Sequence, residues 1–484
     1  MADEIELKLD LSPSAAAAIE ASGLLPGKAG RVRQSSVYFD TPDQAFARAG
    51  VSLRIRKSNG KRVQTIKAAG ASAAGLFARS EWERAVRNDT PVLDAKTPLP
   101  PGLGECADAI APIFEVGIDR HSWVIAEGDA TIEVVLDRGK VVAGDRQSPI
   151  CEIELELKSG APAALFAFAR KLDAVAPVRL GVLTKAERGY RLAGPAPTMV
   201  KAEPVLLVDG ATPARAFAIV ARSCIRQFRL NETLHLAGGG AAALHHARVA
   251  LRRLRSAISI FRPIVGEPGA ALGADLRWLA SELGEARNLD VLLARTRPAG
   301  SLHDSIAAAR ASAYRRVGEV LEMPRTRHMM LDLAEWAARA DRPDRPGSGD
   351  EDVSARAFAI TALDRCSRRA KKRGRDLADL DDADRHGARK AAKKLRYAAE
   401  FFASLFLSKR ERRRYARFVA SLQALQDQLG ALNDLATAAF ILEKLSVADD
   451  PEALRLTAEG QKHKLLHAAE AAHGRLFDLK RFWH

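Results

Sequence analysis

Along the first 195 residues, apolar and polar positions alternate in short runs. Two of these runs are IELKL at 5–9 and EIELE at 152–156, and Gly, Pro, Asn and Asp separate such runs from one another. Because side chains of a strand point alternately to opposite faces, this pattern predicts strands that are apolar on one face and charged on the other. A helical insert is expected around 163–174. The first part of the chain should therefore be mainly β.

From about residue 213 onward the pattern changes to a helical one. Alanine, leucine and arginine recur at helical spacing with few β-branched clusters, which predicts an essentially all-helical region. Gly and Pro at 193–197 interrupt the chain before it, and a second Pro- and Gly-rich stretch at 341–349 divides it. We expect an α+β multidomain protein, with domains at 1–197 and 213–484, a linker at 198–212 and two helical halves that meet near 341–350.

The two helical halves look like copies of one another. A basic segment of the first half returns in the second with a constant offset of 141 residues, and about forty residues after each segment a related tail follows (LGEARN at 283–288 and LGALND at 429–434). Two ordered blocks that agree in spacing indicate a duplicated helical bundle. The paired segments are His245-x-x-Arg248-x-x-x-Arg252-Arg253-Leu254-Arg255 and His386-x-x-Arg389-x-x-x-Lys393-Lys394-Leu395-Arg396.

Charge separates the two parts further. The chain carries a net charge of +15, from 75 Lys and Arg against 60 Asp and Glu. Residues 1–200 contain 26 basic and 25 acidic residues, which leaves 75 − 26 = 49 basic and 60 − 25 = 35 acidic residues for 201–484. The helical part therefore carries nearly all of the excess, as expected for a region that attracts polyanions.

The sequence also suggests a compartment. The four cysteines lie far apart without a C-x-x-C pair, which argues against a zinc ribbon or a dense disulfide framework and fits a reducing environment. The first six residues carry carboxylates where a secretory signal needs basic residues, and no stretch is apolar enough for a membrane helix. We expect a cytoplasmic protein that does not contact the membrane.

Charged strand faces in the first part allow two interpretations. Glutamates recur at every second position of 152–156, and arginines do so at 54 and 56. A solvated sheet face would give this pattern, but stacked glutamates repel one another unless cations lie between them. If the faces instead line a closed barrel, carboxylates can hold a divalent metal while Arg and Lys bind a compact polyanion.

Motifs in the first part resemble the CYTH superfamily, the triphosphate tunnel metalloenzymes. The residues Glu4-Ile5-Glu6-Leu7-Lys8 match its E-x-E-x-K signature, which is weak alone, and an ordered series of further matches extends over about 190 residues. That series comprises Tyr38-Phe39-Asp40-Thr41-Pro42, Leu53-Arg54-Ile55-Arg56, Gln64-Thr65-Ile66-Lys67, Arg79-Ser80-Glu81-Trp82-Glu83, Arg120, Glu133 to Asp137, Glu152 to Glu156, and Lys185 to Arg188.

This resemblance implies an eight-stranded antiparallel tunnel that encloses the reaction. The phosphates would be held by Lys8, Arg54, Arg56, Lys67, Arg120 and Lys185. Magnesium or manganese would be coordinated by Glu4, Glu6, Glu154 and Glu156, together with Glu152 or Glu133. Two roles stay open for four further residues, namely contact with substrate or metal and a purely structural role; these residues are Arg79, Glu81, Glu83 and Asp137. The resemblance also does not identify the glutamate that orients the attacking water.

The basic helical segments also allow two interpretations. Steps of three, four and three residues keep the four basic residues of each segment near one helix face, where they repel one another unless acids or anions lie against them. A solvated basic helix is the alternative. The segments and their tails resemble a CHAD domain over about 210–484, which implies two pseudo-symmetric four-helix bundles with a basic cleft that recognises inorganic polyphosphate.

Residue by residue, the CHAD resemblance assigns polyphosphate contacts to His245, Arg248, Arg252, Arg255, His386, Arg389, Lys393 and Arg396, with Arg253, Lys394 and Arg287 as outer contacts. Asn288 departs from the aspartate expected in the first tail, which leaves the role of that tail open.

Together the two resemblances predict an inorganic triphosphatase of the kind found in bacteria, which cleaves triphosphate to diphosphate and phosphate and can associate with polyphosphate granules. Two alternatives stay open: a non-catalytic polyphosphate-binding scaffold, and a tunnel enzyme acting on an organic triphosphate such as thiamine triphosphate or ATP. Nucleic-acid binding is disfavoured because no groove-reading motif accompanies the basic charge.

Overall fold

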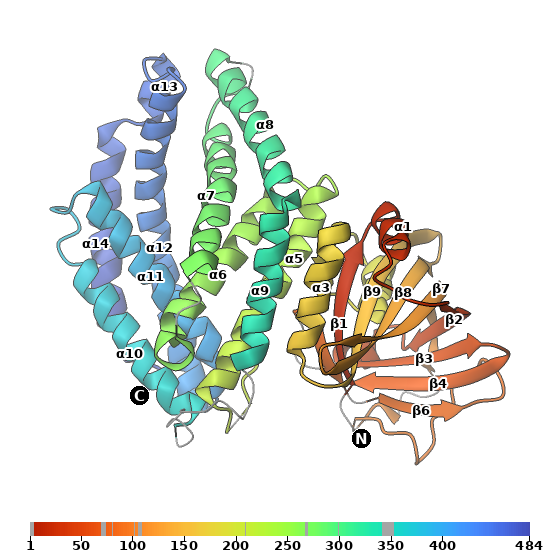
Figure 1. The fold of residues 1–484 in the computed structure, drawn as a ribbon. Coiled ribbons are helices and arrows are strands. Elements are labelled where there is room, and N and C mark those ends of the chain that lie inside the picture. The colour runs from red at the N-terminus through yellow and green to blue at the C-terminus, as the bar shows by residue number, and fades with distance from the viewer. Residues whose placement is uncertain are drawn as a thin grey trace. The chain divides into compact units, whose positions relative to one another are not determined.

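The computed structural model describes residues 4–68, 74–79, 81–100, 102–104, 109–208, 210–266, 270–298, 300–340 and 353–484. The chain forms two compact units. The first comprises residues 1–198, and the second holds nearly all of the remainder (Figure 1). The first is built on a sheet, whereas the second is helical.

A single antiparallel sheet of ten strands forms the first unit. Its strands follow the order β10-β1-β9-β8-β7-β2-β3-β4-β6, and β5 pairs with β1 beside this path. The bounds are β1 (Glu4–Leu11), β2 (Gly30–Asp40), β3 (Val51–Ser58), β4 (Lys61–Ala68), β5 (Leu76–Arg79), β6 (Glu81–Ala85), β7 (Ala111–Glu127), β8 (Ala130–Ala143), β9 (Arg146–Ser159) and β10 (Val178–Leu180).

The two ends of the sheet are linked by the segment that holds β5 and β6. β5 pairs with β1 and β6 pairs with β4, so this stretch crosses from one end of the strand order to the other. The predicted antiparallel β tunnel is confirmed. It counts ten strands instead of eight because β5 and β6 divide the crossing segment and because β10, of three residues, pairs with the end of β1.

The apolar core lies outside the tunnel, between the sheet and its helices. Leu7 and Leu9 are fully buried, whereas Glu6 and Lys8 between and beside them line the interior cavity. The helix α3 (Ala163–Val175), where a helical insert was expected, contacts β1, β9 and β10, and α1 (Pro13–Ala21) contacts α3. A short helix, α2 (Ala45–Arg48), buries Phe46 against β3. The strand alternation therefore directs charge inward and apolar side chains toward the helices.

A short helix, α4 (Lys185–Ala193), lies against β7, β8 and β9. Thr184 and Glu187 form a capping box that fixes its first turn, and Lys185 is its first residue. At Gly189 a Cβ atom would lie 2.0 Å from the ring of Phe114, a buried residue stacked on Tyr38. The helix can rest this close to the sheet because position 189 has no side chain.

Two series of helices form the second unit (Figure 1). The first half contains α5 (Pro213–Leu236), α6 (Ala241–Val265), α7 (Ala270–Leu293), α8 (Ser301–Glu322) and α9 (Pro324–Ala340). The second half contains α10 (Ala355–Arg373), α11 (Asp382–Phe402), α12 (Lys409–Lys444), α13 (Pro451–Leu456) and α14 (Glu459–Phe477), with a 3₁₀ turn at Ala403–Leu405. Contacts between α6 and α11 and between α7 and α12 join the halves.

Reciprocal contacts between α6 and α11 support the duplication. The Arg253 guanidinium of α6 donates a hydrogen bond of 2.5 Å to Glu400 of α11, and Lys394 of α11 donates one of 2.6 Å to Ser259 of α6. Both members of each pair map onto the other pair with the offset of 141 residues seen in the sequence. The expected pseudo-symmetric helical fold is therefore observed.

Two further features bear on the sequence-based expectations. Of the cysteines that the structure describes, Cys151, Cys224 and Cys366 are free, while Cys106 lies outside the described residues. Within the described ranges, no helix combines the length and apolar character needed to cross a membrane.

Candidate functional site

A cavity of about 510 Å³ runs through the sheet unit and gathers the charged strand faces. All six cations predicted to hold phosphate line it, as do Glu6, Glu133, Glu154 and Glu156. The structure thus brings acidic and basic side chains of separate strands into one cavity, which the sequence pattern could only suggest. The six cations are Lys8, Arg54, Arg56, Lys67, Arg120 and Lys185.

Three glutamates form a row across neighbouring strands. Glu6 of β1 lies opposite Glu156 of β9, and Glu156 lies opposite Glu133 of β8. Side chains at directly opposed positions approach to about 5 Å, so these carboxylates repel one another unless a cation lies between them. Lys158 pairs with Glu133 at 2.8 Å and with Glu156, which offsets part of the repulsion.

A second acidic cluster lies beside this row and surrounds Lys185. Asp137, Glu152 and Glu154 offer carboxylate oxygens within 4.8 Å of one another. The Lys185 ammonium lies 2.6 Å from Asp137, 2.6 Å from Glu152 and 2.9 Å from Glu154. Burial alone lowers the pKa of Lys185, but these three carboxylates raise it well above its ordinary value. A fixed positive charge therefore occupies the centre of the cluster.

Glu154 connects the cluster around Lys185 to the rest of the cavity. It pairs with Lys8, Lys185 and Arg120, and although burial raises its pKa, these cations lower it well below the ordinary value. Arg120 also binds Asp137 with two hydrogen bonds of 2.8 and 2.6 Å. Glu154 is thus held ionised by three cations.

Guanidinium groups of β3 and β7 face the same cavity. Burial and the neighbouring Arg54 lower the pKa of Arg56, and Arg120 acts in the same direction, so the three groups lie close together. Arg56 pairs with Glu83 at 3.0 Å, while Arg54 is 3.7 Å from Glu81. The buried Nε of Arg54 has no hydrogen-bond partner among the residues that the structure describes, so it can donate to an anion in the cavity.

Residues whose roles the sequence left open receive partners here. Glu81 binds Lys67 at 2.7 Å and Glu83 pairs with Arg56, so both glutamates orient cations of the cavity wall. Asp137 anchors Arg120 and Lys185. Glu4 lies in β1, but its side chain and that of Arg79 are outside the described part of the structure.

Part of the matched series is structural. Asp40, fully buried, accepts hydrogen bonds from the backbone N–H groups of Phe46 and Ala47 at the start of α2. It also accepts a hydrogen bond of 2.8 Å from the Tyr190 hydroxyl of α4. This carboxylate therefore ties α2 and α4 to β2 and does not line the cavity.

The donor set decides where a divalent metal fits. Carboxylate oxygens are the ligands preferred by magnesium and manganese, and both acidic clusters supply them. Lys185 already neutralises the cluster of Asp137, Glu152 and Glu154, and Arg188 lies 3.5 Å from Glu152. The row of Glu6, Glu133 and Glu156 faces the cavity with fewer cations, namely Lys158 on Glu133 and Glu156 and Lys8 at 3.5 Å from Glu6. Because fewer cations pair with it, the row is the more open candidate for a metal, whereas Glu152, predicted as a ligand, belongs to the cluster around Lys185.

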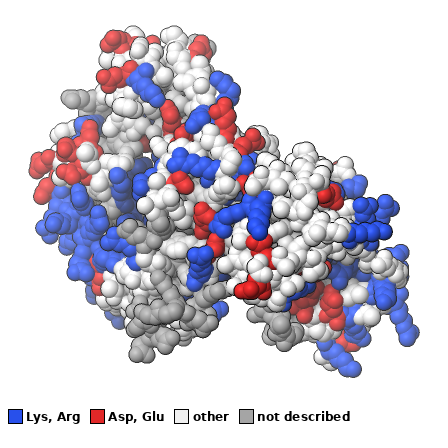
Figure 2. Space-filling model, viewed as in Figure 1, with Lys and Arg blue, Asp and Glu red and all other residues white. Residues whose placement is uncertain are grey.

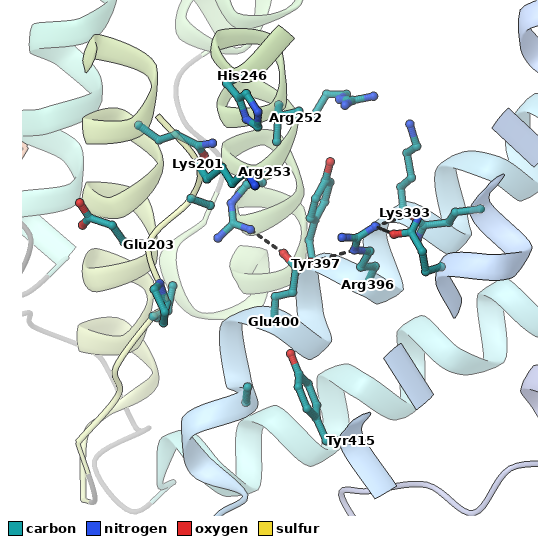
Figure 3. A pocket seen from close by; sticks show the side chains of 18 of the residues that line it. Lys201, Glu203, His246, Arg252, Arg253, Lys393, Arg396, Tyr397, Glu400 and Tyr415 are labelled. Carbon is teal, nitrogen blue, oxygen red and sulfur yellow. Dashed lines mark hydrogen bonds and ion pairs between the residues drawn. The ribbon is translucent and has the colours of Figure 1, made fainter. Parts of the chain in front are cut away.

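A second cavity, of about 1040 Å³, lies within the helical unit (Figure 3). Among the residues predicted to contact polyphosphate, it is lined by His245, Arg252, Arg389, Lys393 and Arg396, with Arg253 from the outer set. The segment 201–206 forms part of its wall, and Figure 3 shows Lys201 of this segment beside the side chains of α6, whereas Glu203 points away from them and pairs with Arg226 of α5.

Cations in this second cavity lie against one another. Burial, followed by Arg252, Arg389 and Arg248, lowers the pKa of Lys393 to about 6, and Asp434 offsets only part of this effect. Burial and the neighbouring arginines likewise lower the pKa of Arg248 to about 10. The Nε atoms of Arg252 and Arg389 are buried without a hydrogen-bond partner in the described part of the chain. We call Arg248, Arg252, Arg389 and Lys393 the cation cluster; Arg248 adjoins the other three but does not itself line the cavity.

The remaining predicted contacts lie apart from this cavity lining. Arg255 is exposed and does not line the cavity. His386 is exposed and hydrogen-bonded to Asn433 at 2.8 Å, and Lys394 contacts Ser259. Arg287 lies 3.7 Å from Asp290, and burial together with Arg287 lowers the pKa of His245. The structure therefore divides the predicted set into cavity residues and outer residues.

Sequence reasoning missed several residues of both sites. Asp10 binds Arg188, which closes one side of the cluster around Lys185, and its position two residues after Lys8 on the same strand face was an available signal. Lys158 could likewise have been found two residues after Glu156. Gln227 and Tyr397, which line the second cavity, carried no signal because each looks like an ordinary helix residue.

The surface of the helical unit is also charged unevenly. Figure 2 shows Lys and Arg gathered over the region of α10. This helix carries exposed basic residues along its second half, namely Arg365, Arg368, Arg369, Lys371, Lys372 and Arg373.

Comparison with known proteins agrees with this geometry. Residues 2–190 match the CYTH domain and residues 219–443 the CHAD domain. The chain therefore contains a CYTH domain followed by a CHAD domain.

Three similar proteins bear on these domains. An inorganic triphosphatase of Haemophilus influenzae is 34% identical over 197 residues, which is 40% of this chain and 55% of that protein, so the match spans about half of its length. The CHAD domain of Ricinus communis aligns with 57% of this chain and 96% of its own at 30% identity and a TM-score of 0.50. A putative adenylyl cyclase from Hippeastrum, described with a dominant triphosphatase activity, covers 38% of this chain and 93% of its own at 21% identity and a TM-score of 0.30.

Proposed function

We propose that the tunnel hydrolyses inorganic triphosphate to diphosphate and phosphate. The observation that carries this proposal is one cavity in which six cations and a row of three glutamates face one another. The relative from Haemophilus influenzae, which matches only the tunnel part, supports an inorganic substrate. Phosphoryl transfer requires mainly positioning and charge neutralisation, and this cavity supplies both.

Each group of residues has a distinct part in the proposed reaction. Arg54, Arg56 and Arg120 bind the phosphate oxygens, with the unpartnered Nε of Arg54 as a ready donor. Lys8 and Lys185 stay protonated because their carboxylate neighbours raise their pKa values. Water attacks the terminal phosphorus, the bridging P–O bond breaks, and diphosphate leaves.

Glu6, Glu133 and Glu156 are the proposed ligands of magnesium or manganese, with Glu154 beside them. When bound, the metal neutralises phosphate charge and orients the reacting oxygens. Without it, the glutamate row repels a polyanion. This repulsion explains why the proposed activity requires a divalent cation together with the substrate.

A phosphate-release assay on the full chain tests the proposal. Triphosphate, ATP and thiamine triphosphate are compared with magnesium, with manganese and with EDTA. We expect triphosphate to be the preferred substrate and EDTA to abolish turnover. Preference for an organic triphosphate would reassign the substrate, and no turnover of any of the three would leave only a binding scaffold.

For the helical unit we propose binding of inorganic polyphosphate by the cation cluster. Burial and then Arg252 and Arg389 lower the pKa values of Lys393 and Arg248, and cations placed this close together gain stability when an anion lies between them. Such binding would place the protein on polyphosphate granules. Competition between polyphosphate and duplex DNA at fixed physiological salt tests the preference, and stronger binding of DNA would contradict it.

A further inference from the structure

The two halves of the helical unit have diverged around their reciprocal contacts. With the offset of 141 residues, Glu400 corresponds to Ser259 and Tyr397 corresponds to Ser256. Cys224 lies beside Arg253 and Cys366 beside Lys394, and three residues after these cysteines stand Gln227 and Arg369. The large cavity is therefore lined by the carboxylate of Glu400, the ring of Tyr397 and the amide of Gln227. The corresponding positions of the other half hold the hydroxyls of Ser259 and Ser256 and the guanidinium of Arg369.

The other half shows what a purely cationic arrangement looks like. Burial lowers the pKa of Lys394, and Arg369, Arg365 and Arg262 lower it further. Its hydrogen-bond partner is the neutral hydroxyl of Ser259. An inorganic phosphate chain needs only such charges and hydroxyls, so it does not explain the different residues on the cavity side.

Gln227 is the most informative of these residues. Its side chain lines the cavity and is 3% exposed, and neither Nε2 nor Oε1 has a hydrogen-bond partner among the described residues. Leaving a buried donor and acceptor unsatisfied is costly, so such pairs normally meet a partner. A primary amide offers one donor edge beside one acceptor, the pattern that matches the hydrogen-bonding edge of a nucleobase.

The same cavity also has apolar lining. Tyr397, Tyr415 and Phe406 belong to its lining, and so do Leu206 and Leu407, which are 74% and 57% exposed. Large exposed apolar side chains at the wall of a cavity favour a ligand that buries them. An inorganic polyanion gains nothing from such surface, whereas an aromatic heterocycle does.

The aromatic part and the cation cluster are continuous. Burial and Arg252 lower the pKa of Arg389, while Asp434 and the Tyr397 hydroxyl partly offset them, so Tyr397 lies next to the cluster. Figure 3 shows Tyr397 between Arg253 and Arg396, with Tyr415 on the side of Glu400. Glu400 binds both of these arginines, at 2.5 and 2.8 Å. One ligand can therefore reach the cluster and the aromatic part together.

We infer that this cavity binds a nucleoside diphosphate or triphosphate, with its phosphates on the cation cluster and its base against Gln227 and the apolar wall. The inference rests on the proposed binding of phosphate groups by the cluster. It adds an organic ligand, separate from the substrate of the tunnel, and makes the helical unit a site that can distinguish a nucleotide from inorganic phosphate of equal charge.

Calorimetric titration of the full chain tests this inference in the presence of EDTA. The chain carries the substitution Arg54→Ala, which weakens phosphate binding in the tunnel. The ligands compared are ADP, GDP, thiamine diphosphate and inorganic diphosphate. Because base stacking and matched amide contacts add to phosphate binding, we expect ADP or GDP to bind at least about tenfold more tightly than inorganic diphosphate. In Gln227→Leu this advantage should fall to within about twofold, with binding of inorganic diphosphate unchanged.

A second variant guards against a folding defect at the buried position 227. Leu206 and Leu407 are exposed, so Leu206→Ser combined with Leu407→Ser should leave thermal unfolding unchanged and lower ADP affinity about threefold. The matched control is Arg369→Leu, which changes the corresponding position of the other half and should leave the advantage of ADP intact.

Three outcomes would overturn the inference. Equal affinities for ADP, GDP and inorganic diphosphate would leave the cavity as an inorganic phosphate site only. Tighter binding of thiamine diphosphate than of either nucleotide would exclude a nucleoside ligand. If no ligand bound, including long polyphosphate, the proposed function of the helical unit would fail as well.

Discussion

The tunnel and the helical cavity both collect cations, but they neutralise them differently. In the tunnel, burial lowers the pKa of Lys8 and Lys185, yet neighbouring carboxylates raise both values above the ordinary one. In the helical cavity, burial and neighbouring arginines lower the pKa of Lys393 to about 6, and Asp434 is the acidic group that opposes them. In the tunnel, carboxylates neutralise the buried lysines before a ligand binds, whereas in the helical cavity the charge of the cation cluster is only partly neutralised.

This difference separates a reaction chamber from an anion receptor. A site whose charges are neutralised holds its side chains in fixed ion pairs, as needed to position a substrate. The glutamate row of the same site can in addition bind a metal ion. A cluster that is only partly neutralised gains most when an anion enters and needs no metal. The two units should therefore respond oppositely to the removal of divalent ions, with loss of turnover in one and retained binding in the other.

The largest expected effect comes from removing the central charge of the tunnel. Lys185→Met leaves Asp137, Glu152 and Glu154 without their shared cation, so we expect a loss of about 3–5 kcal/mol in unfolding free energy. Thermal unfolding measures the loss. Lys171→Met, at an exposed ion pair with Glu127, is the matched control and should change stability by less than about 1 kcal/mol. Equal stability of both variants would disprove the central role of Lys185.

A large effect on turnover is expected from the glutamate row. Glu6→Ala removes one proposed ligand, and we expect kcat for triphosphate to fall by about 10²–10³ while polyphosphate binding is unchanged. Phosphate release and polyphosphate titration measure the two quantities. The control is Glu115→Gln, an exposed residue on β7 that does not line the tunnel cavity. Normal turnover by Glu6→Ala would contradict the proposal that the glutamate row binds the metal.

An intermediate effect concerns the pH dependence of polyphosphate binding. Lys393 is largely neutral above its lowered pKa of about 6, and a bound polyanion favours its protonated form. Binding should therefore take up a proton, and affinity should increase by up to about tenfold for each unit by which the pH falls from 8 to 6. His245, whose pKa is lowered to about 4, contributes little over this range.

Titrations in buffers of different ionisation enthalpy measure that proton uptake directly. Lys393→Arg is the matched control because arginine stays protonated, so its remaining pH dependence is that of polyphosphate itself. Identical proton uptake by the two proteins would show that Lys393 does not titrate on binding.

The smallest effect separates the cavity residues from the outer ones. Arg255 is exposed on α6 and does not line the cavity, so Arg255→Gln should reduce polyphosphate affinity less than about twofold at physiological salt. Arg252→Gln removes a member of the cation cluster and should have a clearly larger effect. If Arg255→Gln were the more damaging variant, the outer surface of α6 would be the principal binding site.

Local sequence pattern predicted much of this arrangement. Alternation along β1 and β9 correctly assigned Glu6, Lys8 and Glu154 to one charged face, and the repeat offset matched the reciprocal contacts of Arg253 and Lys394. Both follow from periodicity within an element, which a sequence displays directly.

Relations between elements were beyond such reasoning. The row of Glu6, Glu156 and Glu133 depends on the register of three strands, which no single strand encodes. Lys185 lies among three carboxylates because α4 packs against the sheet, although the sequence placed it with the phosphate-binding cations and Glu152 with the metal ligands. Arg255 stands ten residues after His245, which at about 100° per residue leaves it about 80° short of three full turns, and that difference places it outside the cavity.

The contact between α4 and the sheet ties the chemistry of the tunnel to an uncharged position. Gly189 lets the helix descend onto Phe114, and this depth brings the ammonium at the first residue of the helix among its acids. A methyl group added at position 189 would clash with the ring of Phe114 and push the helix α4 away from the sheet. The position of Lys185 among its carboxylates thus depends on Gly189, a residue that does not line the cavity.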